Sequence, residues 1–295
     1  MQADIHTLYE SDFYRILDFR CRCIDCNTSK PEYSNAFAIS FVRKGNFIFN
    51  VFRHALDSYT GCALVTKPGY THTVTHAHTI PDECTIFEFK REFYSQLPAH
   101  FGHHGFFINN DIHSTLVQTN PAMEFLHFYI LQLIHKKAGS KLQIDNLVMD
   151  MSSKILGAVT DYKPNERISS RLKKNHLVTI ERAKEYMTTN FSSDISLSEV
   201  AEYSYVSLFH FSRIFKAFTS LSPHQFLLAI RLQHAATLLR NTEVPLADIT
   251  FSSGFNSIEY FTAAFGLKYN LSPAKFRAQP VSGQKGPVIL TGWEK

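Results

Sequence analysis

An internal repeat constrains the fold of this chain more than any other feature of its sequence. Residues in the C-terminal third recur at an offset of 50 positions, and a repeat of this length indicates one supersecondary unit used twice. The matched pairs are Phe211 with Phe261, Phe215 with Phe265, Leu221-Ser222-Pro223 with Leu271-Ser272-Pro273, and Phe226 with Phe276. Each copy has the pattern of two helices joined by a tight turn, so the repeat predicts two helix-turn-helix units.

The first copy contains clear signals for helix ends. Ser196-Leu197-Ser198-Glu199 forms a capping box, which predicts the start of a helix. After a turn near residues 204–206, Ser207 is suited to cap a second helix that runs to about Phe218. Its apolar stripe is Leu208, Phe211, Ile214, Phe215 and Phe218. The other faces carry Phe209, Ser212, Arg213 and Lys216, a set suited to base edges and phosphates.

A longer helix is predicted between the two copies. Ser222-Pro223 supplies a cap and an N1 proline, and the apolar pattern continues through Leu239. Such a helix of roughly 18 residues is about 27 Å long, shorter than the roughly 34 Å between successive major-groove faces of straight DNA. If both units bind at once, we expect bent DNA, at a cost of about 1–6 kcal/mol.

Charge is distributed unevenly along the chain. Residues 1–170 carry 16 Lys+Arg against 17 Asp+Glu, whereas residues 171–280 carry 12 against 8. The basic surplus therefore lies with the repeat, where a polyanionic partner would bind. The sequence has no apolar run long enough to span a membrane and no secretory signal, so we expect a soluble, cytoplasmic protein without membrane contact. All 5 cysteines precede residue 85, and we expect them to be reduced.

The N-terminal third has the period of β-strands. Phe37, Ile39 and Phe41 alternate with smaller residues, Gly45 interrupts, and the alternation resumes at Phe47, which predicts a hairpin. Further strands are expected near residues 63–66 and 85–89, as in a barrel or sandwich. Helical periodicity follows at about residues 121–135 and 142–160, and the polar stretch 161–174 is typical of a linker.

The C-terminal hundred residues resemble the DNA-binding domain of the AraC/XylS transcription regulators. The matching motifs are Ser207-x-x-His210-Phe211-Ser212-Arg213-Ile214-Phe215-Lys216, Arg231-Leu232-x-x-Ala235, Ile249-x-x-x-x-Gly254-Phe255, Tyr260-Phe261 and Ser272-Pro273-x-x-Phe276-Arg277. The resemblance implies a seven-helix, two-unit DNA reader that usually activates transcription by touching RNA polymerase.

Carried over by position, the resemblance places Phe209, Ser212 and Arg213 against bases and Lys216 against phosphate. The second copy departs from the family pattern, because Ala263 and Gly266 stand where an arginine and a lysine are usual. We therefore expect the first copy to supply most of the affinity. The full predicted DNA-binding set is Ser207, Phe209, His210, Ser212, Arg213, Lys216, Asn256, Ser257, Glu259 and Thr262.

The segment Gly61-x6-Pro68-Gly69-x-x-His72 resembles the cupin-type sensor domains of the same family. Such a barrel would enclose a small-molecule effector, with the two following helices packed outside it as a dimer interface. A metal or thiol site is a further hypothesis. Its candidate residues are Cys21, Cys23, Cys26, His72, His76, His78, Glu83 and Cys84. Metal binding, reversible thiol oxidation and a purely structural role all remain open.

Together these observations predict an α+β chain: a cupin-like β-barrel with two flanking helices, then an all-α domain of two helix-turn-helix units joined by a long helix. The expected boundaries are 1–110 for the sensor, 111–160 for the dimerisation helices, 161–175 for the linker, 176–279 for the DNA-binding domain and 280–295 for a tail. The predicted function is that of an effector-responsive transcription activator and not of an enzyme. The activator is expected to be a homodimer. The alternatives are a cupin-type metalloenzyme with a structural helical domain and a purely protein-binding helical module.

Overall fold

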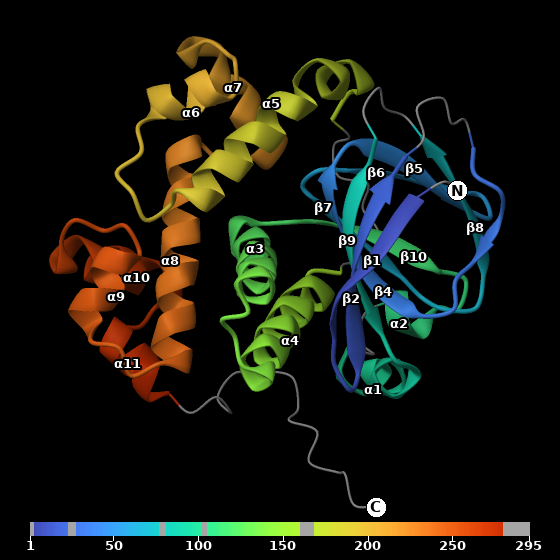
Figure 1. Ribbon diagram of the computed structural model, residues 1–295, viewed down its shortest axis with the longest axis horizontal. Helices are drawn as coiled ribbons and strands as arrows, with labels where there is room; N and C mark the ends of the chain where they lie inside the picture. The colour runs from blue at the N-terminus through green and yellow to red at the C-terminus, as the bar shows by residue number, and fades with distance from the viewer. Residues whose placement is uncertain (1–2, 23–27, 77–80, 102–104, 160–167, 280–295) are drawn as a thin grey trace, which may run out of the picture. The chain divides into compact units, whose positions relative to one another are not determined.

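The computed structural model describes residues 3–22, 28–76, 81–101, 105–159 and 168–279 (Figure 1). These residues form two compact units. The first unit comprises the described residues up to Asn120, together with Lys154–Arg182 and Ala217–Thr219. The second comprises Pro121–Ser153, Ala183–Lys216 and the described residues from Ser220 onward. Sheets belong to the first unit, and the repeat lies almost entirely in the second.

Two antiparallel sheets build the first unit. The six-stranded sheet has the order β1 (Ala3–Glu10), β2 (Tyr14–Cys21), β9 (Glu83–Phe89), β4 (Phe37–Lys44), β7 (Cys62–Thr66) and β10 (Ser114–Gln118). The four-stranded sheet has the order β3 (Glu32–Tyr33), β8 (Thr71–His76), β5 (Asn46–Val51) and β6 (His54–Tyr59). Strands β7 and β9 confirm the two strands expected after the first alternating segment. Helices α1 (Arg91–Phe101) and α2 (Gly105–Ile108) follow β9.

The core of the first unit lies between the two sheets. One buried cluster takes Val42, Leu64 and Cys84 from the larger sheet and Phe49 and Val74 from the smaller one. Two sheets that share such a cluster pack face to face, and their side chains occupy the space between them. Neither sheet closes on itself in the part of the chain that is described, where β1, β10, β3 and β6 are edges. The closed cupin-like barrel is therefore not confirmed.

The hairpin predicted around Gly45 is wrong. Strand β4 pairs with β7 and β9, whereas β5 pairs with β6 and β8, so the chain crosses from one sheet to the other at this point. Gly45 has a φ of +82°, a conformation that favours glycine. The alternating sequence pattern is the same for a hairpin and for a corner between sheets, because in both cases successive side chains of each strand point to opposite faces.

The two helices expected after residue 120 are present as α3 (Pro121–Lys136) and α4 (Lys141–Gly157). They differ from the expectation in their packing, because α3 and most of α4 belong to the second unit. In that unit α3 packs along α8 (Pro223–Asn241), and the Phe125 ring lies 5.7 Å from the His234 ring and 5.5 Å from the Phe191 ring. The aromatic side chains of α3 thus supply part of the helical core.

The predicted linker is partly helical. Residues 161–167 lie outside the described part of the chain, but α5 (Ser170–Thr189) begins before the expected end of the linker. Lys173 is buried within the first unit, where its Nζ forms an ion pair with Asp57 and lies 5.0 Å from the centre of the Tyr59 ring. A lysine that looks like a solvated linker residue is therefore a packed one.

The remaining helices contain the repeat. They are α6 (Leu197–Tyr203), α7 (Leu208–Thr219), the long helix α8, α9 (Leu246–Ser252), α10 (Ile258–Tyr269) and α11 (Pro273–Ala278), coloured yellow to red in Figure 1. Helix α8 has 19 residues, close to the predicted length. Within the described part of the chain, no helix is both long enough and apolar enough to cross a membrane.

Candidate nucleic-acid interface

The first helix-turn-helix is formed by α6 and α7, and its start is fixed by the predicted capping box. The Ser196 hydroxyl accepts a hydrogen bond from the Glu199 amide at 3.2 Å, and the Ser196 amide donates to the Glu199 carboxylate at 2.5 Å. This exchange satisfies two of the amides that a helix start leaves open. Ser207 is the N-cap residue of α7, but among the described residues its side chain makes no capping hydrogen bond.

The buried side of α7 fixes the rotation of this helix. Phe211 and Phe215 are fully buried, with ring centres 5.5 Å apart, and Phe215 meets Phe226 of α8 edge-on at 5.3 Å. Such edge-to-face contacts between large rings hold a helix more specifically than aliphatic contacts alone. With the phenylalanine side buried, the opposite side of α7 faces solvent.

That exposed side carries four of the ten predicted DNA contacts. His210, Arg213 and Lys216 are exposed and Ser212 is half-buried. The Arg213 Nη2 and His210 Nδ1 atoms lie 3.3 Å apart. The side chain of Phe209 lies outside the described residues. The structure therefore brings Ser212, Arg213 and Lys216 onto one accessible face, as predicted for a recognition helix.

The second helix-turn-helix repeats the packing of the first. Phe261 and Phe265 of α10 are fully buried with ring centres 5.5 Å apart, and Phe265 meets Phe276 of α11 edge-on at 5.2 Å. Both α7 and α10 end at a residue in the left-handed conformation, Ser220 with φ 60° and Asn270 with φ 56°. The repeat detected in the sequence is thus a repeat of side-chain geometry.

The two turns differ by one residue, which the offset of 50 does not reveal. Val206 donates its amide hydrogen to the Ala201 carbonyl, and Phe255 donates in the same way to Thr250, so these turn residues are 49 apart. Helices α7 and α10 begin 50 residues apart. Asn256, one of the predicted contacts, is therefore an additional residue in the second turn, and it is exposed.

Gly254 allows the second turn to pass close to the rest of the unit. Its φ is +80°, and a Cβ atom there would lie 2.5 Å from the Phe191 carbonyl oxygen and 2.8 Å from Arg231 Nε. Arg231 holds the same segment, because its Nε donates to the Phe191 carbonyl at 2.7 Å and its Nη2 to the Ser193 carbonyl at 2.8 Å. Arg231 and Gly254 appeared in the sequence only as family motif residues, and the structure gives them a positioning role.

The exposed side of α10 is poorer in cations than that of α7. Glu259 is exposed and Thr262 is half-buried, while Ala263 and Gly266 occupy the places that Arg213 and Lys216 occupy in α7. The Ser257 hydroxyl accepts a hydrogen bond from the Tyr260 amide at 3.2 Å, so its primary role in the structure is a helix cap. Sequence reasoning did not single out Tyr205, whose side chain is 81% exposed in the first turn.

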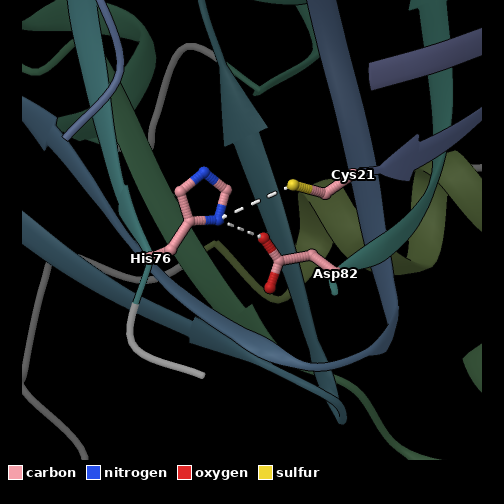
Figure 2. A group of neighbouring side chains, drawn as sticks. All are labelled: Cys21, His76 and Asp82. Carbon is pink, nitrogen blue, oxygen red and sulfur yellow. Dashed lines mark hydrogen bonds and ion pairs between the residues drawn. The ribbon is translucent and has the colours of Figure 1, made fainter. Parts of the chain in front are cut away.

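The candidate metal or thiol residues of the first unit are only partly brought together. Cys21, His76 and Asp82 form a buried group (Figure 2), and sequence reasoning missed Asp82 because no motif contains it. Cys23, Cys26 and His78 lie outside the described residues. His72 is apart from this group, stacked on Phe49 at 4.5 Å and 3.1 Å from the Ser34 hydroxyl.

Glu83 and Cys84, which follow Asp82, have other surroundings. Glu83 forms ion pairs with Lys44 at 3.2 Å and Arg43 at 3.7 Å. Cys84 lies in the core between the sheets, and burial raises the pKa of its thiol. A buried thiol with a raised pKa reacts slowly with oxidants, which disfavours Cys84 as a redox sensor.

Comparisons with known proteins match the helical part of the chain. Residues 200–279 match a family model described as a helix-turn-helix domain. The HTH-type transcriptional activator RhaR of Mannheimia succiniciproducens is 30% identical over 93 residues, which is 32% of this chain and 34% of that protein. The HTH-type transcriptional activator RhaS of Escherichia coli is 32% identical over 92 residues, covering 31% of this chain and 33% of that protein.

A solved structure is similar to about the same share of the chain. The C-terminal domain of AraT, a response regulator from Geobacillus stearothermophilus, has 33% sequence identity and a TM-score of 0.34, and covers 36% of this chain and 89% of that chain. The chain spans about a third of the length of the two curated relatives described above. The resemblance of the helical region to AraC-type regulators is confirmed. These relatives are regulators, so they give no support to the metalloenzyme alternative.

Proposed function

We propose that this chain is a sequence-specific DNA-binding transcription regulator that reads DNA mainly with α7. It activates transcription and is located in the cytoplasm. The exposed face of α7 is the observation that carries this proposal. Arg213 and Lys216 project from a helix whose other side is fixed by buried Phe211 and Phe215. A rigid helix with cations and a hydroxyl on one open face fits the major groove, where arginine reads bases and lysine binds phosphate.

The two helix-turn-helix units contribute unequally to this function. Ser212 and Arg213 of α7 read base edges, and Lys216 binds the phosphate backbone. The second turn offers Asn256, and the exposed face of α10 offers Glu259 and Thr262, for a second, weaker contact. Helix α8 separates the two helix-turn-helix units and, with 19 residues, is about 28 Å long. Simultaneous binding to two successive major-groove faces then favours DNA bent toward the protein.

The salt dependence of DNA binding tests the role of Lys216. We expect genome-wide footprinting to yield a preferred operator, on which affinity is measured by fluorescence anisotropy at several salt concentrations. Lys216→Ala lowers the slope of log affinity against log salt by about 0.9, because one phosphate contact is lost. Lys30→Ala is the matched control, since it removes the same charge from an exposed site in the first unit. Equal slopes for the two variants, or no preferred operator, would contradict the proposal.

Arg213 is tested by specificity rather than by salt. Arg213→Ala lowers discrimination between the operator and single-base variants at one position by about 1–3 kcal/mol. Lys216→Ala weakens binding to all sequences alike. Anisotropy on a set of single-base operator variants separates the two effects, and an Arg213→Ala protein with unchanged preferences at every position would remove Arg213 from the base-reading set.

We also propose that the first unit, cupin-like in having two facing sheets, senses a small-molecule effector. A cavity of about 820 Å³ supports this, and its walls include Arg15, Tyr33, Glu88, Arg91 and Tyr94. That volume suits a small ligand. The effector would raise the midpoint of thermal unfolding and change operator affinity, and a compound that raises the midpoint in the wild type but not in Arg91→Ala would identify the site. Equal shifts in both proteins would place binding elsewhere.

Two protein partners complete the proposal. The family resemblance implies contact with RNA polymerase, and in-vitro transcription from the operator with purified polymerase tests it: an unchanged transcript level would contradict activation. A homodimer through α3 and α4 is supported by Leu142, which is 71% exposed at the start of α4. Sedimentation velocity should show a dimer that Leu142→Glu weakens, and a wild-type monomer at DNA-binding concentrations would refute it.

A further inference from the structure

Three side chains with metal-binding atoms converge at one end of the first unit. Cys21 ends β2, His76 ends β8, and Asp82 immediately precedes β9. His76 Nδ1 lies 3.9 Å from Cys21 Sγ and 2.9 Å from Asp82 Oδ2, and the three ligand atoms all lie within 4.8 Å of one another. Figure 2 shows the Nδ1 side of the imidazole turned toward both the sulfur and the carboxylate.

The group is buried and held by the backbone. The side chains of His76 and Asp82 are 3% and 2% exposed, and Cys21 is 4% exposed. The Cys21 amide donates to the Asp82 carbonyl at 2.9 Å, which fixes two of the three residues relative to each other. Gly45 lies directly against the Asp82 carboxylate, because a Cβ atom at Gly45 would lie 2.7 Å from Asp82 Oδ1. The carboxylate is thus confined from above by the corner between the sheets.

The donor types and spacing fit one divalent transition ion. For tetrahedral zinc with ordinary bond lengths, the S···N separation is about 3.6 Å and the N···O separation about 3.3 Å. The observed distances of 3.9 Å and 2.9 Å differ from these by about 0.3–0.4 Å, a change that small side-chain rotations supply. Thiolate, imidazole and carboxylate together combine soft, borderline and hard donors, which suits zinc better than copper(I) or magnesium.

We propose that Cys21, His76 and Asp82 form a zinc site with three protein ligands and a fourth position open to another donor. The three donor atoms lie together in a buried place, where a bound ion would replace the hydration that these side chains lose on folding.

Cobalt binding to the full-length protein is the primary test. After chelation under reducing conditions, Co²⁺ titration should saturate at one ion per chain with a thiolate-to-cobalt charge-transfer band, and Zn²⁺ should displace it. Cys21→Ala should abolish the band. His76→Asn and Asp82→Asn should each weaken zinc binding more than about 100-fold, beyond the loss seen when only outer partners of a ligand change.

Matched control variants replace a histidine and a cysteine of the first unit that lie outside the proposed zinc site. His72→Asn changes the other histidine of β8 whose position is described, and Cys62→Ala changes a buried thiol of β7, so both should bind zinc like the wild type. Circular dichroism checks the fold of every variant. Should a ligand variant fail to fold, the wild type alone decides, because zinc must raise and a chelator lower its thermal unfolding midpoint.

Two outcomes would overturn the assignment. The first is a wild-type protein without stoichiometric cobalt or zinc binding, in which case the three residues are a buried structural cluster. The second is a protein in which Cys21→Ala abolishes the charge-transfer band but His76→Asn and Asp82→Asn leave the affinity for the ion unchanged. The ion would then be held by thiolates alone. Neither outcome depends on DNA binding, so the zinc site and the regulator function are tested separately.

Discussion

Placing a lysine at position 266 tests whether the second helix-turn-helix binds DNA weakly because it lacks cations. A Cβ atom at Gly266 would meet no heavy atom of the described residues within 4 Å, so a side chain there extends into open space. Gly266 lies inside α10, and replacing an interior helical glycine by lysine stabilises a helix by about 0.5–0.8 kcal/mol. The new cation would stand where Lys216 stands in α7.

The expected effect on DNA binding follows from counterion release. One additional phosphate contact steepens the salt dependence by about 0.9 in the log–log slope. Over a fourfold rise in salt, the advantage of Gly266→Lys over the wild type should therefore fall by about 3.5-fold. Fluorescence anisotropy on the operator across that salt range measures both quantities.

Gly266→Gln separates charge from helix stability. Glutamine has nearly the same helix propensity as lysine but no charge, so it should stabilise α10 equally and leave the salt slope unchanged. If Gly266→Lys and Gly266→Gln give the same slope, the face of α10 that holds Gly266 does not approach phosphate, and the comparison of α10 with α7 fails as an account of DNA binding.

Two further predictions concern the stability of the helical unit. His234 is buried beside Phe125 and 2.8 Å from the Ser253 hydroxyl, and burial lowers its pKa from 6.5 to about 4; the folded state therefore favours the neutral ring, and stability that is complete above pH 6.5 should fall by about 3 kcal/mol as the pH approaches 4. Urea unfolding at both ends of this range should show a smaller loss for His234→Gln, and equal losses would refute the assignment. Gly254→Ala should lower the free energy of unfolding by about 2–4 kcal/mol, because a positive φ and a backbone overlap are combined. Gly69→Ala, with φ +99° but no described atom within 4 Å of the new Cβ, should cost only about 1–2 kcal/mol; similar losses for the two would contradict the role of the overlap.

The features that the sequence predicted correctly are local ones. The capping box at Ser196, the proline start of α8 and the buried stripe around Phe211 each depend on residues within one or two helical turns. The repeat added a longer-range inference, because a matched pair of phenylalanines in each copy implied the same packing twice. This was enough for the helical unit and for the face of α7.

The features that the sequence did not reveal depend on contacts between distant segments. Lys173 is buried because Asp57 lies beside it, and the two are 116 positions apart. Gly45 joins two sheets rather than two paired strands, which only the pairing of β4 and β5 with other strands decides. Asp82 belongs to no motif and acquires its partners His76 and Cys21 through the fold. The additional residue Asn256 was concealed because the alignment relied on the helices and not on the turns.

The near-identical ring geometry of the two copies gives the chain an internal reference. Phe215 with Phe226 and Phe265 with Phe276 meet at 5.3 Å and 5.2 Å, with interplanar angles of 83° and 82°. Because the buried packing of the two copies is so similar, the differences between the exposed faces of α7 and α10 are not required by folding. We therefore expect that the exposed residues of α7 can be transferred to α10, and that a chimera with two α7 faces binds a DNA site that is itself a direct repeat.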